Sequence, residues 1–397
     1  MKINSLFLLA TCVLAHASSC LADGLYYIRP DAEGRKDGSD WNNAYTAPPK
    51  AMQRGSTYYV ADGSYAKQSF DSPEVSTQAI TIIKATDADH GIDEGWNPAY
   101  GDGVAEFPGL TFNTDWWILD GAGRKVPDSG CGLRLSSTTD LSTLVTLEGK
   151  RSHITIRNVE LVGDTTLEKR ITGIYGVQGP SHLEIQHCHI HDLFGVPFHF
   201  IDAANILIEF CLIARTKSTP EWHTAGIQAR GCTALTVRYN KWEDINGTAV
   251  IVSGSGNSSR WNVYGNIFLR GNVGHGMVAD NDWDTIEDVQ VSGNIIVGHR
   301  GNAGMNFFKS KGRITIVDNV WYDNSWISFS GVTTQDYNHF SNCKFPFAFQ
   351  PAPHETPVRR GEDANYSIVK TSPFSDLGKG DFSLSRDALQ AITHERK

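Results

Sequence analysis

The residues best suited to chemistry gather in one short stretch of the chain. The segment from Ala214 to Thr224 carries an ammonium group, a carboxylate, an indole and an imidazole, on Lys217, Glu221, Trp222 and His223. Gln228 and Arg230 follow within a few positions. An aromatic face can stack on a sugar, a carboxylate or imidazole can move a proton, and a guanidinium can bind a carboxylate. The mixture favours a catalytic or sugar-binding site; the alternative is a polar loop whose Trp222 packs on the protein.

Other titratable and charged residues recur at intervals along the chain. His199 is the strongest candidate among the histidines, because strand alternation turns it outward beside Gln228. Asp244 offers a catalytic carboxylate. Arg270 and Arg300 offer cations for substrate. Several residues are expected at the same edge, namely His189, His191, Asp192, Glu243, Asn246 and His299, whereas His275 is expected to turn inward against the core.

Three carboxylates alternate in the run Asp280-Asn281-Asp282-Trp283-Asp284. Ca²⁺ takes several oxygen ligands from a tight turn, so Asp280, Asp282 and Asp284 are candidate calcium ligands. The run is not an EF-hand, because Thr285 and Val291 stand where that loop needs Gly and Glu. A solvated acidic turn is the alternative interpretation.

A repeat of about 26 residues must position these groups. Strand-like segments with alternating apolar residues end at Val159, Cys188, Cys211, Asn240, Asn266, Asn294 and Asn319. A second motif keeps the same period, with apolar residues at Ile174, Phe198, Ile227, Val250, Met277, Met305 and Ile327. Two registers with one period predict short parallel strands stacked as a solenoid. In the second motif we expect outward columns of Tyr175, His199, Gln228, Ile251, Val278, Asn306 and Ser328, and of Val177, Ile201, Arg230, Ser253, Asp280, Phe308 and Ser330.

The segment ends form a predicted ladder of stacked residues. Stacked Asn amides can satisfy turn backbone groups and one another. Cys188 and Cys211 share the ladder, either as buried thiols or as a disulfide. Among the seven cysteines there is no CxxC or zinc-finger spacing.

Composition excludes several classes of protein. Of the 397 residues 40% are hydrophobic, which excludes bulk disorder, and Gly is frequent at 38, which favours many turns between strands. A net charge of −9 disfavours nucleic acid as a partner. Residues 1–22 resemble a signal peptide: Lys2 precedes an apolar run too short to span a bilayer. We expect a secreted or periplasmic protein without an integral membrane segment; lipid attachment at Cys20 is the less favoured alternative.

The repeats resemble those of the right-handed parallel β-helix superfamily, which includes pectate lyases, alginate lyases, polygalacturonases and phage tailspike glycanases. The segments from Tyr26 to Tyr65 resemble the opening of such chains, where a short capping helix precedes the first coil. Ser372-Pro-Phe, Asp381-Phe-Ser-Leu and Ala388-Leu-Gln-Ala-Ile resemble their closing segment. The resemblance implies an all-β fold in one domain over 23–397, clearest over 144–340, with a loop at 84–106 and an irregular C-terminal wrap at 344–362. It also implies a monomer that binds polysaccharide in a groove along one sheet.

Three functions remain open. A lyase would cleave a uronic-acid glycan by β-elimination, with Arg230 neutralising the carboxylate and His223, His199 or Lys217 as the base; uronan epimerases share this proton abstraction. A glycoside hydrolase would need two carboxylates, drawn from Glu221, Asp244, Glu243, Asp202 and Asp280. Gly274-His275-Gly276 matches one polygalacturonase motif, but the Asp-Asp that should precede it is missing. The third function is a non-catalytic carbohydrate-binding solenoid.

Overall fold

The structure is a computed structural model. It describes residues 24–122, 131–164, 166, 169–218, 224–280, 285–344, 352–353, 374–376 and 381–384. The predicted signal peptide, the Glu221-Trp222-His223 run, Asp282 and Asp284 lie outside these ranges.

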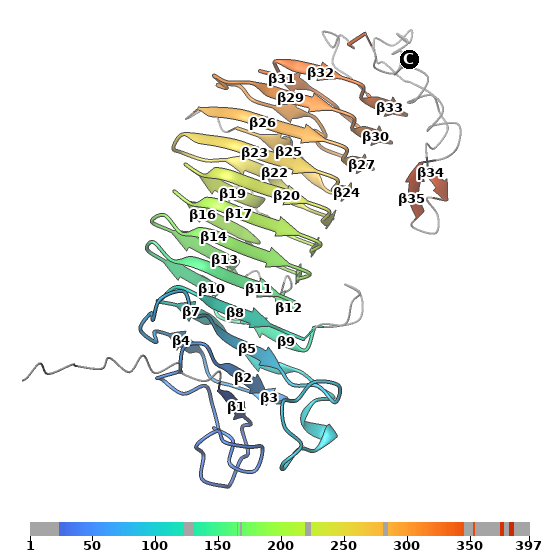
Figure 1. The fold of residues 1–397 in the computed structure, drawn as a ribbon. Coiled ribbons are helices and arrows are strands. Elements are labelled where there is room, and N and C mark those ends of the chain that lie inside the picture. Colours follow the sequence, from blue (N-terminus) through green and yellow to red (C-terminus); the bar gives the residue numbers. More distant parts are fainter. Residues whose placement is uncertain are drawn as a thin grey trace, which may run out of the picture.

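Three long sheets of parallel strands form the molecule (Figure 1). Sheet A contains β1 (Leu25–Ile28), β2 (Thr57–Val60), β5 (Ile80–Lys84), β8 (Trp117–Asp120), β11 (Ser152–Arg157), β14 (Ser181–Gln186), β17 (Ala204–Glu209), β20 (Thr233–Arg238), β23 (Ser258–Tyr264), β26 (Ile286–Ser292), β29 (Ile314–Val317) and β32 (Thr334–Asp336). Sheet B contains β3 (Gly63–Ser64), β6 (Ala105–Phe107), β9 (Leu133–Ser136), β12 (Val159–Val162), β15 (His189–His191), β18 (Leu212–Ala214), β21 (Lys241–Glu243), β24 (Ile267–Leu269), β27 (Ile295–Val297), β30 (Val320–Tyr322) and β33 (His339–Ser341). Sheet C contains β4 (Gln68–Phe70), β7 (Leu110–Phe112), β10 (Ser142–Glu148), β13 (Ile171–Val177), β16 (Phe198–Ile201), β19 (Ala225–Arg230), β22 (Asn246–Ser253), β25 (Asn272–Ala279), β28 (Met305–Asn306) and β31 (Phe329–Ser330).

Each coil passes through sheets A, B and C in turn, and the next coil stacks on it. Strands β14, β15 and β16 follow one another along the chain, and β17 then pairs with β14. All three sheets therefore advance along one axis, as the predicted solenoid requires. The repeat in the sequence is one coil of this helix.

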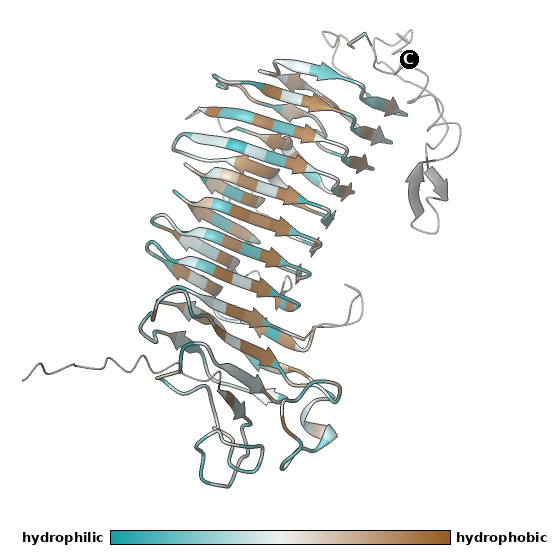
Figure 2. Ribbon diagram, in the orientation of Figure 1, coloured by the Kyte–Doolittle hydropathy of each residue, from teal (hydrophilic) through white to brown (hydrophobic). Residues whose placement is uncertain are grey.

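The core lies between the three sheets, where alternate side chains point inward. In sheet A the inward positions stack in register, as at Ile156, Ile185, Ile208 and Val237, and all four side chains are buried. Figure 2 shows the resulting alternation of apolar and polar residues along the strands. Burial of stacked aliphatic side chains supplies the main stabilisation of such a solenoid.

The predicted Asn ladder is confirmed at the turn between sheets A and B. Oδ1 of Asn266 accepts the backbone N–H of Asn240 at 3.0 Å, and Oδ1 of Asn294 accepts that of Asn266 at 2.9 Å. Asn319 and Asn338 continue the ladder. The side-chain amides donate to carbonyls of the preceding coil, so these buried groups are satisfied.

Two thiols occupy the ladder positions of the preceding coils. The backbone N–H of Cys188 lies 3.4 Å from Sγ of Cys211, and both side chains are buried. Neither forms a disulfide, nor do the other three cysteines within the described ranges. The interpretation as buried thiols is confirmed.

The N-terminal end of the stack differs from the expectation of a capping helix. Residues 24–65 form strands and turns only. Trp41 is buried there against Tyr27, Trp96 and Tyr100. The last two belong to the predicted loop at 84–106, which carries the 3₁₀ helix η1 (Pro98–Tyr100). This aromatic cluster, held by the loop, shields the first coil from water, which is the role expected of the capping helix.

At the other end, two of the predicted closing segments form strands. β34 (Phe374–Asp376) and β35 (Asp381–Leu384) pair antiparallel. Most of the expected wrap at 344–362 lies outside the described residues. Within the described ranges no helix has the length and apolar character needed to cross a membrane.

Candidate functional site

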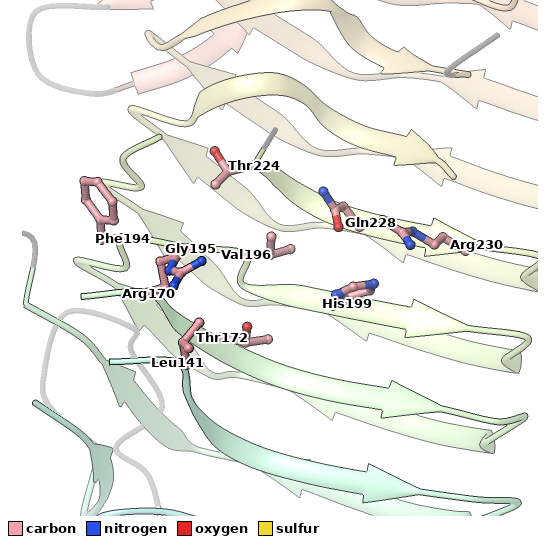
Figure 3. A pocket seen from close by; sticks show the side chains of 10 residues that line it. All are labelled: Leu141, Arg170, Thr172, Phe194, Gly195, Val196, His199, Thr224, Gln228 and Arg230. Atoms are coloured by element: carbon pink, nitrogen blue, oxygen red, sulfur yellow. The ribbon is translucent and has the colours of Figure 1, made fainter. Parts of the chain in front are cut away.

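A cavity of about 460 Å³ opens on the outer face of sheet C, across β13, β16 and β19. Turns between sheets B and C form one wall of it. The residues that line it are Leu141, Arg170, Thr172, Phe194, Gly195, Val196, His199, Thr224, Gln228 and Arg230 (Figure 3). Three residues predicted from the sequence, His199, Gln228 and Arg230, thus lie in one cavity.

Strand pairing explains how His199 and Gln228 come together. Residues 198–201 of β16 pair in register with 227–230 of β19, which places His199 beside Gln228 and Ile201 beside Arg230. Phe198 and Phe200 point into the core on either side of His199. The alternation therefore holds the imidazole outward, and Figure 3 shows it beside the side chains of Gln228 and Arg230.

The imidazole of His199 is held in its neutral form. Burial, with the charge of Arg230 as a second cause, lowers its pKa to about 4. Its ring meets Tyr175 edge-on, with 5.2 Å between centroids. Nε2 is buried and has no hydrogen-bond partner among the described residues. A neutral imidazole with an unused ring nitrogen is suited to accept a proton.

Arg230 supplies a cation beside this imidazole. It forms no ion pair within the described part of the chain. Its side chain passes over Gly254, where an added Cβ would collide with Cγ of Arg230. A larger residue at position 254 would therefore require this side chain to move.

Arg170 supplies a second cation at the opposite wall. It contacts Asp140 at 3.7 Å, and its backbone forms a β-bridge to Phe194. Sequence reasoning missed Arg170, Thr172 and Phe194. Arg170 and Phe194 lie in the turns before the sheet C strands. The alternation of side chains along a strand does not predict the orientation of side chains in a turn. Thr172 lies two positions before the repeat residue Ile174, which is the one signal that the sequence carried for it.

The remaining predicted residues lie elsewhere. Asp244 and Arg270 pair with each other at 3.0 Å, and Arg300 contacts Asp323 at 3.4 Å. These ion pairs lie at the turn after sheet B, outside the set that lines the cavity. The structure therefore does not bring these three residues into the cavity that contains His199, because stacking at the same edge does not place side chains in the same cavity.

Lys217 also falls outside the set that lines the cavity. It is exposed, and its backbone N–H donates to Leu193 at 2.9 Å. Glu221, Trp222 and His223 come after it, outside the described residues, so their roles stay predictions. Thr224, the first described residue after this gap, lines the cavity.

The outward columns predicted for sheet C lose their register after Gln228, although Asn306 lies in the column of Gln228 as predicted, because it pairs with Ala279. Gln228 pairs with Val252, and Val252 with Ala279, so Ile251 and Val278 face the core instead. The offset lies between β19 and β22, and a separate β-bulge between Gly247 and Ala249 alters the register where β25 pairs with β22. It also leaves His275 exposed, opposite to the inward orientation predicted for it.

Two further candidates are buried. His299 was expected at the surface but is 2% exposed, and burial with Arg300 nearby lowers its pKa to about 3. Asp280 is fully buried, and its carboxylate accepts the backbone N–H groups of Phe308 and Lys309 at 2.9 and 2.8 Å. These bonds give Asp280 a structural role between coils. The calcium hypothesis rests on Asp282 and Asp284 as well and stays a prediction.

The comparisons identify the family. The chain matches the family described as "Right handed beta helix region" over residues 128–282 and 172–345, more than half of its length. It belongs to that family of right-handed β-helix proteins.

Several solved structures are similar in fold. XylC in complex with xylose is 8% identical, with a TM-score of 0.46 and coverage of 83% of this chain and 76% of that one. Pectate lyase Pel9A is 14% identical, with a TM-score of 0.41 and coverage of 91% and 89%. A mannuronic acid specific polysaccharide family 6 lyase from human gut microbiota is 12% identical, with a TM-score of 0.39 and coverage of 87% and 94%. Identities this low bear on the fold alone. No curated protein matches the sequence.

Proposed function

We propose that this protein is a polysaccharide lyase that cleaves a uronic-acid glycan by β-elimination in the sheet C cavity. The observation that carries the proposal is the neutral His199 with an unused Nε2, set in one cavity with two guanidinium groups, Arg170 and Arg230. Two cations and a base are what proton abstraction beside a carboxylate requires.

The reaction places each group in a role. Arg230, with Arg170 at the opposite wall, binds the uronate carboxylate and stabilises the negative charge that develops when the C5 proton leaves. The imidazole of His199 accepts that proton. The C5–H electrons form the C4=C5 double bond, the C4–O bond breaks, and the leaving oxygen takes a proton from the imidazolium or from water. An epimerase would share the first step and then return a proton to C5.

The lining residues favour elimination over glycoside hydrolysis. Hydrolysis uses two carboxyl groups that flank the scissile bond. Among the described residues that line the cavity there is no Asp or Glu. Glu221, which lies outside the described residues, is the carboxylate that a hydrolytic mechanism would need first.

The test is an assay on a panel of acidic glycans, with and without a calcium chelator. Lyase products carry a double bond that absorbs ultraviolet light, hydrolase products carry new reducing ends only, and an epimerase releases neither but changes C5 configuration by NMR. We expect ultraviolet-absorbing product that His199→Ala abolishes and Glu221→Gln retains. Arg313→Ala, at an exposed hollow on sheet A, is the matched control and should retain activity. Reducing ends without absorbance, lost in Glu221→Gln, would replace the lyase by a hydrolase.

We further propose that residues 1–22 direct export, since an enzyme that acts on an extracellular polymer must leave the cytoplasm to reach it. Mass spectrometry of the protein recovered from periplasm or medium tests this proposal. An N-terminus near Ser18 or Asp23, after the small-x-small patterns Ala15-His16-Ala17 and Cys20-Leu21-Ala22, supports it, and an intact Met1 contradicts it.

A further inference from the structure

Two histidines and a glutamate form a compact cluster on the outer face of sheet B, separate from the cavity on sheet C. Glu160 belongs to β12, and His189 and His191 belong to the adjacent β15. Each residue offers one ligand atom, and the three atoms lie within 4.8 Å of one another. Strand geometry explains the cluster: residues 189 and 191 are two apart and point to the same face, and Glu160 pairs with His189.

The contacts of His191 fit two tautomers. Nδ1 lies 2.6 Å from Oδ2 of Asp192 and 2.9 Å from Nη2 of Arg215, so it can donate to the carboxylate or accept from the guanidinium. Nε2 lies 3.0 Å from Oε1 of Glu160, and when Nδ1 carries the proton Nε2 presents its lone pair to that oxygen. Two electron-rich atoms at this distance require a cation between them, either a proton or a metal ion.

Arg134 forms an ion pair with Glu160, which favours the carboxylate form of that side chain. Arg134 contacts Oε2 at 2.6 Å, which leaves Oε1 directed at the imidazole. Arg215 in turn binds both oxygens of Asp192. Two carboxylates thus offset two guanidiniums, so a dication enters a region that is near neutral.

We propose that Glu160, His189 and His191 bind a divalent transition-metal ion of the zinc class. Imidazole nitrogens suit Zn²⁺, Co²⁺ and Ni²⁺ and are poor ligands for Ca²⁺. Zn²⁺ holds its nitrogen and oxygen ligands at about 2.0–2.1 Å, so two ligand atoms across a tetrahedral angle lie roughly 3.3 Å apart. The 3.0 Å between Nε2 of His191 and Oε1 of Glu160 needs little adjustment.

The outer contacts match those of known metal sites. A metal-bound His donates its other N–H to a carboxylate, which fixes the ring and raises its basicity. Asp192 makes this contact to His191, and Arg215 holds Asp192 in place. Water would complete the coordination. The site is independent of the proposed lyase activity, since none of its three ligands lines the sheet C cavity.

Titration of the untagged protein with Co²⁺ tests the site, because Co²⁺ bound to nitrogen and oxygen ligands absorbs visible light. We expect one equivalent to bind, with Zn²⁺ displacing it. His189→Ala and Glu160→Gln should each weaken Co²⁺ binding at least tenfold. Glu160→Gln keeps the size of the side chain, and circular dichroism establishes that each variant is folded.

The matched control is another pair of stacked histidines. His153 and His182 stack at 4.7 Å on neighbouring coils, and within the described residues their side-chain hydrogen bonds involve no carboxylate. The double variant His153→Ala/His182→Ala should bind Co²⁺ as the wild type does. Wild-type protein that binds no Co²⁺ at tenfold excess would show that a proton bridges His191 and Glu160 and would overturn the proposal. Binding that survives in His189→Ala and Glu160→Gln but is lost in the control would overturn it as well.

Discussion

His199 and Arg230 lie on paired strands of neighbouring coils, and the charge of Arg230 adds to burial in lowering the pKa of His199 to about 4. The same guanidinium that discourages protonation of the imidazole also attracts an anion to the cavity. Carboxylate binding would offset the Arg230 charge and so raise the basicity of His199 when the substrate is in place. Binding of the anion and activation of the base are thereby linked in one pair of residues.

This pair predicts an unusual pH dependence. The base must be unprotonated, so kcat/KM should fall as pH drops through the pKa of His199 in the free protein. Because that pKa is about 4, kcat/KM should stay level down to about pH 5 and then decline tenfold per unit. The dependence of kcat/KM on pH, measured with the glycan that is cleaved fastest, shows this decline at low pH. A midpoint near 6.5, the value of an ordinary histidine, would show that another group is the base.

His199→Gln should lower kcat by roughly 10²–10⁴-fold, the usual contribution of a general base, with a small change in KM. The amide keeps a polar group in the cavity but cannot accept the C5 proton at useful rates. Steady-state kinetics with equal amounts of folded protein give both constants. A rise in KM with kcat unchanged would assign His199 to substrate binding alone.

Gly254→Ala should weaken substrate binding through Arg230. The new methyl group would collide with Cγ of Arg230, whose side chain must then leave its position. We expect KM for an acidic glycan to rise several-fold, approaching the effect of Arg230→Ala, while kcat changes less. Gly293→Ala is the control, because no atom lies within 4 Å of the position of its added Cβ. Its positive φ makes that substitution mildly strained, so stability is measured for both variants. Equal KM values in wild type and Gly254→Ala would show that Arg230 does not bind substrate in this position.

Asn294→Ala should destabilise the fold strongly. The Asn294 side chain accepts the backbone N–H of Asn266 and donates to the carbonyl of Val263, all of them buried. Loss of the amide leaves both groups unsatisfied, which costs roughly 3 kcal/mol. Urea unfolding measures the change. Gln290→Ala, at an exposed position on sheet A, should change the unfolding free energy by less than about 0.5 kcal/mol. Similar unfolding free energies of the two variants would show that the Asn ladder does not stabilise the fold.

The ladder also explains why much of the fold follows from the sequence. Each coil needs an inward pair of aliphatic residues and a residue that forms hydrogen bonds with the backbone groups of the turn. The spacing of residues such as Asn266 and Asn294 therefore gives the length of the repeat directly. The sheet C column was predictable as far as Gln228 for the same reason. Beyond it β22 lies one residue out of the predicted register, with Val252 rather than Ile251 beside Gln228, and no residue type marks such an offset.

The rest of the candidate site depends on turns. Arg170 reaches the cavity because its backbone bridges to Phe194 in the turn of the next coil, a contact that no periodicity encodes. Asp244 and Arg270 were predicted as site residues from their types and their place at the same edge of the stack, yet their opposite charges satisfy each other across one coil. Ion pairs between stacked coils and catalytic groups use the same residue types, so type and spacing cannot separate them.

His299 predicts a loss of stability in acid that one substitution should reduce. Burial, with Arg300 nearby, holds its folded-state pKa at about 3, below the value of 6.5 expected in the unfolded chain. Between these values the unfolded chain binds the proton and the folded protein does not. Stability is therefore fully present above pH 6.5 and falls as pH drops toward 3. From pH 7 to pH 5 this group alone should cost about 2 kcal/mol.

His299→Leu removes this titration and keeps an apolar side chain in the core. Urea unfolding at pH 7 and pH 5 should show a smaller loss of stability in the variant than in the wild type. His182→Ala, at an exposed position, is the control and should lose as much stability as the wild type. An equal loss in His299→Leu and wild type would mean that the folded protein accepts a proton on His299. The ring would then lie in a more polar setting than its 2% exposure indicates.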